Sequence, residues 1–501
     1  MGISKYMSRI KFRKRFSSPH LSSIRFRKFK AFADSGKIPL KPITLIVGKN
    51  SAGKSSLIRG LAAAAQTSKE IKPVVSDFRL IGENVNLGTY FDTIHLNNKE
   101  DNFTLDFEIM PGREGYDSRY NFSYTYTNDI IDPLGAKLHS VKVENNNVVL
   151  LKASEPYKKI PPKIKKDFPR LTVFRDRSIL KGLNMNKQKF FPKKVESNSE
   201  EEDKLNEALE AFTEVMRKRE GKTPEELESE TYYIAELEDF EISLHQNRSL
   251  FSSVDDSLRE TIGETQSMSS TLRRFLANSS YIGPIRLEPV REAKLAQGSS
   301  RRIGSKGENL EKLLHNKLSD INFKNELNQH LKDLGIADSI HTLPSFTKVD
   351  GEDEPTGYIK VQLEKSGRMR SLMDLGSGTS QVLPVVFEIV VRDNTLILLE
   401  QPELHLHPAA QSAMGSVLKS AIEQGNQLIV ETHSANIIER LRRLIREGEL
   451  DKNYVNIIYV GSNNKNETFC QNIGFDENGE FTEEWPEDTF FGEREKEYLG
   501  W

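Results

Sequence analysis

The feature that most constrains the fold is the segment 48–55, GKNSAGKS, which fits the pattern G-x-x-x-x-G-K-[S/T]. An apolar run at 43–47 precedes it and predicts a short buried strand, and residues 56–66 predict a helix. A strand, a glycine-rich turn and a helix in this order are the context in which this pattern forms a phosphate-binding loop. The glycines let the backbone curl so that N–H groups point at phosphate oxygens, and the helix adds its positive dipole end.

The loop assigns roles to two side chains. Lys54 is expected to bridge the β- and γ-phosphates of a nucleoside triphosphate, and the Ser55 hydroxyl is expected to bind Mg²⁺. The loop alone does not distinguish kinases, GTPases and ATPases. Its candidate nucleotide-binding residues are Gly48, Lys49, Asn50, Ser51, Ala52, Gly53, Lys54, Ser55 and Ser56.

Composition excludes several other classes of protein. The 501 residues are 37% hydrophobic and 29% charged, which is an ordinary globular composition, and the net charge of −2 gives no general attraction to nucleic acid or membrane. The lone cysteine, Cys470, allows no internal disulfide and fits a cytoplasmic location. Because no apolar run approaches about 20 residues, we expect no membrane insertion. Residues 1–33 are basic without any acidic residue, which leaves open a transit peptide, a basic tail or a natural start at Met7.

Changes in pattern along the chain divide it into four segments. Residues 23–150 are expected to hold the phosphate loop and an antiparallel sheet, since 103–149 contains several short alternating stretches. Residues 151–275 are expected to form a helical, acidic insertion, because the composition becomes acidic and helix-forming from about Lys194 to Gln266. Residues 276–460 complete the nucleotide-binding part, with continuous apolar runs at 395–399 and 427–430 that predict buried parallel strands. Residues 461–501 form a C-terminal tail.

Three further motifs follow in order: DLGSGTSQ at 374–381, TLILLEQPELHLHP at 395–408 and IVETHSAN at 429–436. In this order they resemble the signature loop, the Walker B strand with its D-loop, and the H-loop of ABC ATPases. Together with ITLIVGKNSAGKSS they resemble the RecF/OLD-like branch, and within it a set of bacterial AAA-type predicted ATPases with E-Q-P-E-x-H-L-H-P and a Trp-Pro tail, here Trp485 and Pro486. The resemblance covers most of residues 23–501 apart from the insertion.

This resemblance implies an α/β P-loop NTPase fold, an ABC-type ATPase head with a β-subdomain and a helical insertion, and ATP and Mg²⁺ as cofactors. Glu400 ends a buried strand, so its carboxylate can hold Mg²⁺ through a water. The neutral imidazole of His433 can contact the γ-phosphate or the attacking water. In ABC proteins the signature loop caps the ATP of the opposite subunit, which implies a homodimer or a higher even oligomer. The residues expected in that flexible loop, which precedes a helix, are Ser377, Gly378, Thr379 and Ser380.

The sequence departs from the common ABC pattern at the general base. Gln401 stands where a glutamate is usual, and an amide cannot accept a proton at neutral pH. Either hydrolysis is slow and ATP mainly locks the dimer, or Glu403 acts as the base. The candidate catalytic residues are therefore Gln401, Glu403 and His433. His405 and His407 fit a loop before Pro408 better than a metal site.

Several functions remain open from the sequence. The first is a dimeric ATP-gated switch or clamp in DNA repair or anti-phage defence, with an effector such as a nuclease expected as a separate protein. The second is the motor of an ABC transporter, which needs a separate membrane subunit. The third is a binding protein with little turnover. A possible DNA path consists of basic residues at 25–30 and of Arg286, Arg291, Arg301, Arg302 and Lys306, for which an ordinary solvated surface is the alternative.

Overall fold

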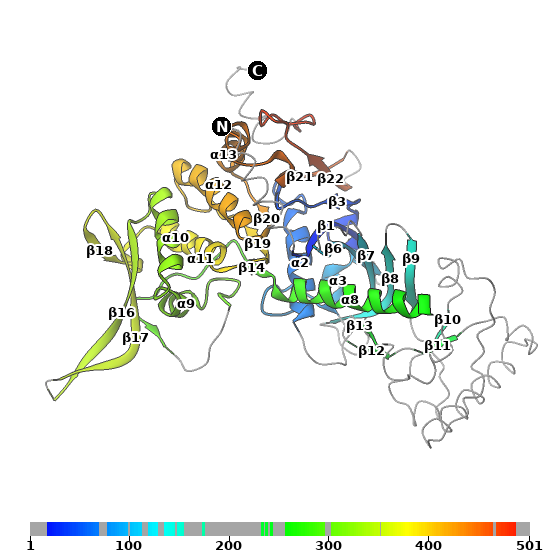
Figure 1. Cartoon of the computed structure of the whole chain (residues 1–501), viewed down its shortest axis with the longest axis horizontal. Coiled ribbons are helices and arrows are strands. Elements are labelled where there is room, and N and C mark those ends of the chain that lie inside the picture. Colours follow the sequence, from blue (N-terminus) through cyan, green and yellow to red (C-terminus); the bar gives the residue numbers. More distant parts are fainter. Residues whose placement is uncertain are drawn as a thin grey trace, which may run out of the picture.

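Figure 1 shows the computed structural model, in which the phosphate loop follows an inner strand of a central sheet. The structure describes residues 18–69, 78–98, 101–112, 119–128, 135–145, 148–154, 173–175, 232–234, 236–238, 241–243, 256–295, 302–350, 352–463 and 467–486.

The central sheet has six strands in the order β14-β19-β20-β4-β21-β22. They are β14 (Ser280–Ile282), β19 (Leu396–Glu400), β20 (Gln427–Glu431), β4 (Ile43–Gly48), β21 (Val455–Ser462) and β22 (Thr468–Ile473). The first five strands run parallel and β22 runs antiparallel to β21. The strand that carries the phosphate loop, β4, therefore lies beside β20, and β20 separates it from β19.

Helices cover both faces of this sheet because its central strands are apolar on both sides. Leu398 and Ile429 pack in one core with α2 (Lys54–Ser68), α8 (Asp256–Asn278) and the antiparallel sheet. Leu399 and Val430, one residue further along the same strands, pack in the other core. The helices of that second core are α9 (Leu310–Lys317), α10 (Ile321–Asp333), α11 (Ser377–Val391), α12 (Pro408–Glu423) and α13 (Ala435–Arg446).

The alternating segments of the N-terminal half form an eight-stranded sheet. Its strands are β1 (His20–Phe29), β2 (Phe32–Asp34), β3 (Ile38–Pro39), β5 (Phe78–Arg79), β6 (Phe103–Met110), β7 (Tyr120–Asn128), β8 (Gly135–Asn145) and β9 (Val148–Ser154). Aromatic rings fill its inner side, with the centroids of Phe29 and Phe103 5.5 Å apart and those of Phe103 and Tyr126 5.2 Å apart. The predicted fold class, an α/β P-loop NTPase with a β-subdomain, is confirmed.

A third sheet projects from the molecule and was not predicted (lower left of Figure 1). It consists of β15 (Ala293–Lys294), β16 (Ser339–Val349), β17 (Glu352–Lys365) and β18 (Arg368–Ser371). Buried and exposed residues alternate only in part of it, at Ile359, Val361 and Leu363 of β17, and several apolar side chains elsewhere in the sheet are exposed, among them Leu343, Phe346 and Val349. The short remaining elements are α3 (Tyr90–Thr93), η1 (His95–Asn97), η2 (Leu372–Asp374) and η3 (Lys452–Tyr454).

Two of the expected segment boundaries fall inside elements. The boundary at 275 lies within α8, whose Leu272, Phe275 and Leu276 belong to the core around α2. The boundary at 460 lies within β21, and the following strand β22 completes the central sheet. In the segment 151–275 the structure describes β10 (Val173–Arg175), β11 (Tyr232–Ile234), β12 (Glu236–Glu238), β13 (Glu241–Ser243) and part of α8. The basic residues before 18 and the acidic stretch at 199–231 lie outside the described residues, so the helical insertion stays a prediction.

Candidate nucleotide-binding site

Close packing confines the phosphate loop at both of its ends. Gly48 ends β4 with a φ of 142°, and a Cβ there would lie 2.1 Å from the carbonyl oxygen of Val460 on β21. Gly53 caps α2 with a φ of 103°, and a Cβ there would lie 2.8 Å from the Cβ of Ala31. Both positions therefore require glycine, for conformation and for space. The predicted order of strand, loop and helix is present, with residues 49–53 between β4 and α2.

Lys54 and Ser55 begin α2, at the positive end of its dipole. The Lys54 ammonium donates to the carbonyl oxygens of Gly48 at 2.9 Å and Lys49 at 2.6 Å, so it lies over the loop. Burial lowers the pKa of Lys54, and the nearby Glu431 carboxylate opposes that shift. The Ser55 hydroxyl donates to Oε2 of Glu431 at 2.8 Å. A hydroxyl beside a carboxylate is the kind of oxygen pair that Mg²⁺ takes, so the residues present fit this ion.

Glu400 lies at the end of β19 as predicted, but its carboxylate is engaged by its own chain. Its Oε1 accepts from the Tyr281 hydroxyl at 2.7 Å and from Nε of Arg59 at 3.1 Å, and its Oε2 accepts from Nη2 of Arg59 at 3.2 Å. The carboxylate that contacts Ser55 is instead Glu431, which ends β20 beside Glu400. Glu431 was not predicted as a site residue, although the apolar run 427–430 ends at this acid just as the run 395–399 ends at Glu400.

We expect the substitution Tyr281→Phe to destabilise the protein. It removes a hydrogen bond to a carboxylate that is only 1% exposed, and such bonds contribute about 1.5–3 kcal/mol. The midpoint of urea denaturation should fall accordingly. The control is Tyr358→Phe, because Tyr358 lies exposed on β17 and should leave the midpoint unchanged. Equal midpoints for both variants and the wild type would contradict the role of Tyr281 in holding Glu400.

The turn after β19 is held in a strained conformation. Gln401 has a φ of 48°, and its N–H donates to the carbonyl oxygen of Glu431 at 2.8 Å. The buried guanidinium of Arg286 donates through Nη2 to the carbonyl oxygens of Glu400 at 2.7 Å and Gln401 at 3.3 Å. Arg286 therefore fixes the turn, and a buried residue cannot line a path for nucleic acid. This corrects the earlier placement of Arg286 among surface basic residues.

Glu403 and His433 lie together beside this turn. Oε1 of Glu403 accepts from the backbone N–H of His433 at 2.7 Å, while its buried Oε2 has no hydrogen-bond partner among the described residues. Burial raises the pKa of Glu403, whereas burial and the charge of Lys54 lower the pKa of His433. His433 is thus a neutral imidazole near pH 7 that lies within the electrostatic reach of Lys54, as its predicted role requires.

The signature residues differ from the flexible loop that the sequence predicted. Ser377, Gly378, Thr379 and Ser380 form the first turn of α11, capped by Gly376. A Cβ on Gly378 would lie 2.5 Å from the carbonyl oxygen of His405, so this turn packs tightly against the loop that follows β19. The N–H of Thr379 donates to the carbonyl oxygen of Gly376 at 3.0 Å, and the turn stands at a helix N-terminus, which remains suited to an anion. The imidazole of His407 accepts from the N–H of Ala409 at 3.3 Å and so caps α12.

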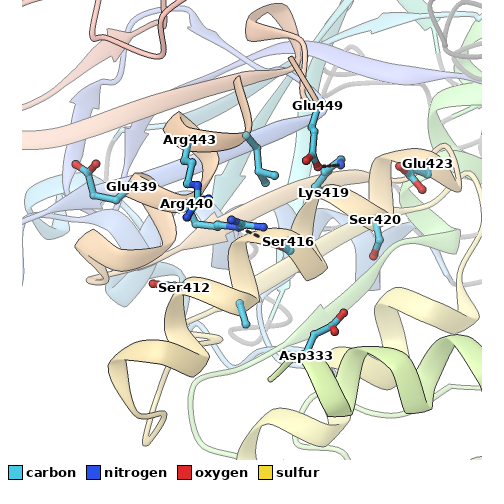
Figure 2. Close-up of a pocket in the computed structure, with 12 residues that line it drawn as sticks. Asp333, Ser412, Ser416, Lys419, Ser420, Glu423, Glu439, Arg440, Arg443 and Glu449 are labelled. Atoms are coloured by element: carbon cyan, nitrogen blue, oxygen red, sulfur yellow. Dashed lines mark hydrogen bonds and ion pairs between the residues drawn. The ribbon is translucent and has the colours of Figure 1, made fainter. Parts of the chain in front are cut away.

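A cavity of about 720 Å³ lies elsewhere, between α12, α13 and the end of α10 (Figure 2). Its polar groups are largely paired: Arg440 donates to the Ser416 hydroxyl at 2.9 Å, and Lys419 contacts Glu449 at 2.8 Å. Its lining includes no residue of the phosphate loop, of the signature turn (377–380) or of the His433 loop (432–434).

Comparison with known proteins identifies the family to which this site belongs. Residues 20–438 match the family described as the AAA ATPase domain. The chain belongs to this AAA ATPase domain family. The matched residues include the phosphate loop, the first turn of α11, the strand β19 and His433, and the predicted membership of an AAA-type ATPase family is confirmed.

Other similarities of this AAA ATPase are more distant. It is 28% identical over 181 residues to the Old nuclease of Escherichia phage P2, a match that covers 32% of this chain and only 30% of the phage protein. Among solved structures, it is similar to the SMC head domain of Pyrococcus furiosus (12% identity, TM-score 0.40, 91% of this chain and 96% of the other) and to that of Thermotoga maritima (12%, 0.32, 90% and 98%). TM-scores this low carry no functional argument.

The remaining sequence expectations concern surfaces. No helix in the described part of the AAA ATPase is both long and apolar enough to cross a membrane. Of the basic residues proposed for a DNA path, Arg27 pairs with Asp106 at 2.9 Å and Lys28 with Asp101 at 2.6 Å. Arg301 lies outside the described residues. These ion pairs leave less free charge for phosphate groups than the sequence alone indicates.

Proposed function

We propose that this AAA-family protein binds ATP and Mg²⁺ and hydrolyses ATP as a homodimeric switch or clamp of the RecF/OLD-like branch. Its closed dimer controls a separate effector, such as a nuclease, in DNA repair or anti-phage defence in the cytoplasm. The observation that carries the dimer is the placement of the two phosphate-binding helix ends. The helix that follows the phosphate loop, α2, packs on one face of the central sheet, and α11 with the signature turn packs on the other.

Because α2 and α11 lie on opposite faces of the sheet, we expect their N-termini to act on one nucleotide only when a second copy, related by a two-fold axis, supplies one of the two. The signature turn of each chain then caps the nucleotide held by the phosphate loop of the other chain, and two ATP molecules lie in the interface. Ser377 is exposed at the N-terminus of α11, as a residue that meets another chain must be in the isolated protomer. Each bound ATP adds interactions that only the closed dimer makes, so ATP favours the dimer by mass action.

We expect Ser377→Arg to prevent ATP-dependent dimerisation. The arginine adds bulk at the centre of the expected contact, while its exposed position leaves the fold intact. The measurement is light scattering at micromolar concentration, with and without ATP and Mg²⁺. The matched control is Ser319→Arg, in the exposed turn between α9 and α10, which should dimerise like the wild type. A wild-type protein that binds ATP yet stays monomeric would refute the sandwich dimer.

The amide at Gln401 favours a second candidate function, in which ATP locks the dimer with little turnover. The two candidates differ in the steady-state ATPase rate of the purified wild type with saturating Mg²⁺. A measurable turnover per protomer that rises with protein concentration supports the hydrolysing switch, because it shows that hydrolysis depends on the dimer. Dimers that persist without phosphate release support the lock.

A further inference from the structure

Two carboxylates lie side by side at the carboxyl ends of two inner strands of the central sheet, near the expected nucleotide. Glu400 ends β19 and Glu431 ends β20, and the two residues are direct partners in the parallel ladder. Both side chains are almost fully buried, with 1% and 4% exposure. The sequence assigns a role in binding Mg²⁺ only to Glu400. The contacts of the two side chains show which carboxylate is available for a metal ion.

The contacts of Glu400 use both of its oxygens. Arg59 reaches it from α2 with two nitrogens, and the Tyr281 hydroxyl reaches it from β14. A carboxylate with a guanidinium and a phenol already bound has its charge compensated and its oxygens oriented toward those donors. For Glu400 to bind a metal ion or its water, this buried ion pair has to break, which is costly in a buried setting.

The contacts of Glu431 leave it directed at the phosphate loop. Its Oε2 accepts the proton of the Ser55 hydroxyl at 2.8 Å, and its Oε1 accepts no hydrogen bond from the described residues. It lies near enough to Lys54 for their charges to interact, so it faces the end of the loop where the β- and γ-phosphates are expected. Small hydrated Mg²⁺ ions in phosphate sites usually take one or two protein oxygens and keep several waters.

We infer that Glu431, rather than Glu400, is the carboxylate that holds Mg²⁺ or one of its waters beside Ser55. The inference rests on the proposed ATP–Mg²⁺ function of the same loop. Arg59 and Tyr281 then act as positioning residues. They hold the Glu400 carboxylate by hydrogen bonds, so that Glu431 alone of the two carboxylates contacts Ser55. The positive charge of Arg59 compensates the negative charge of Glu400, so only the charge of Glu431 remains to attract the metal ion.

The test compares the affinity for ATP with Mg²⁺ and with EDTA, measured by calorimetry on the full chain. In Glu431→Gln the Mg²⁺-dependent gain in ATP affinity should disappear, because the affinity of the bound nucleotide for Mg²⁺ falls by about 10–100-fold, the usual loss when a residue of a metal site is removed. The affinity in EDTA should be unchanged or tighter, since one negative charge near the phosphates is lost. The amide can still accept from Ser55, so the loop keeps its shape.

A second measurement uses Mn²⁺ in place of Mg²⁺ and follows free Mn²⁺ by electron paramagnetic resonance in the presence of ATP. Glu431→Gln should leave more Mn²⁺ free than the wild type, and Glu431→Asp, which keeps the charge but shortens the side chain, should lie between them. If Glu431→Gln does not fold, the aspartate variant decides. The matched comparison is Glu400→Gln, which should keep the metal-dependent gain while lowering the denaturation midpoint.

The opposite pattern overturns the inference: a metal-dependent gain that survives in Glu431→Gln and disappears in Glu400→Gln assigns the metal to Glu400. A wild type that binds ATP in neither condition refutes the proposed function itself, so the two failures are distinguishable.

Discussion

Replacing Lys54 by alanine is expected to abolish ATP binding. The ammonium lies over the loop, held by two carbonyl oxygens of the loop itself, so it is already positioned where phosphate charge arrives. Its loss leaves the backbone N–H groups and the helix dipole to bind a polyanion, and Glu431 is then left without the cation that lies beside it. Calorimetry with Mg²⁺ should show no heat of binding at ATP concentrations that saturate the wild type.

The control for this experiment is Lys317→Ala, which removes the same charge at the exposed end of α9. It should bind ATP like the wild type, which separates the loss of a local contact from the loss of net charge. Circular dichroism checks that Lys54→Ala is folded. Unchanged affinity in a folded Lys54→Ala protein would refute the assignment of the phosphate loop.

The sequence predicted the parts of this molecule that depend on local patterns. The phosphate loop follows from glycine spacing between an apolar strand and a helix, and the buried strands β19 and β20 follow from continuous apolar runs. The segment 103–149 predicted antiparallel strands because its side chains alternate. Each of these signals can be read in short windows of about 11–18 residues, over which periodicity is informative.

The sequence did not predict features that depend on long-range contacts. Arg59 and Glu400 are 341 positions apart, and their pairing exists only because α2 packs across β19 and β20. Glu431 follows an apolar strand just as Glu400 does, yet only the fold shows which of the two meets Ser55. The signature residues were expected in a loop because their motif resembles the ABC signature loop, but they form the first turn of α11, where Gly378 packs against the backbone of His405.

The assignment of the general base can be decided by the variant Glu403→Gln. Its carboxylate has one oxygen bound to the N–H of His433 and one buried oxygen without a partner among the described residues, and burial raises its pKa. A carboxylate with a free oxygen and a raised pKa is a stronger base than an exposed one, and it suits the removal of a proton from water. The glutamine side chain has the same shape and can still accept from His433, so the substitution removes the base and keeps the loop.

Glu403→Gln is therefore expected to lower the steady-state ATPase rate by about 10²–10⁴-fold, the usual contribution of a general base, while the affinity for ATP stays the same. The companion variant Gln401→Glu introduces a carboxylate at the position where ABC ATPases carry their base, on a turn whose backbone Arg286 already holds. If Glu403→Gln turns over like an active wild type, Glu403 is not the base and only orients the segment around His433, and the His433 imidazole becomes the candidate base. A faster Gln401→Glu variant would then show that a carboxylate at position 401 can serve as a base, as it does in other ABC ATPases. If Glu403→Gln loses turnover and keeps ATP affinity, Glu403 carries the proton and Gln401 serves the turn, because a side chain that only held His433 would be replaced by glutamine without loss of rate.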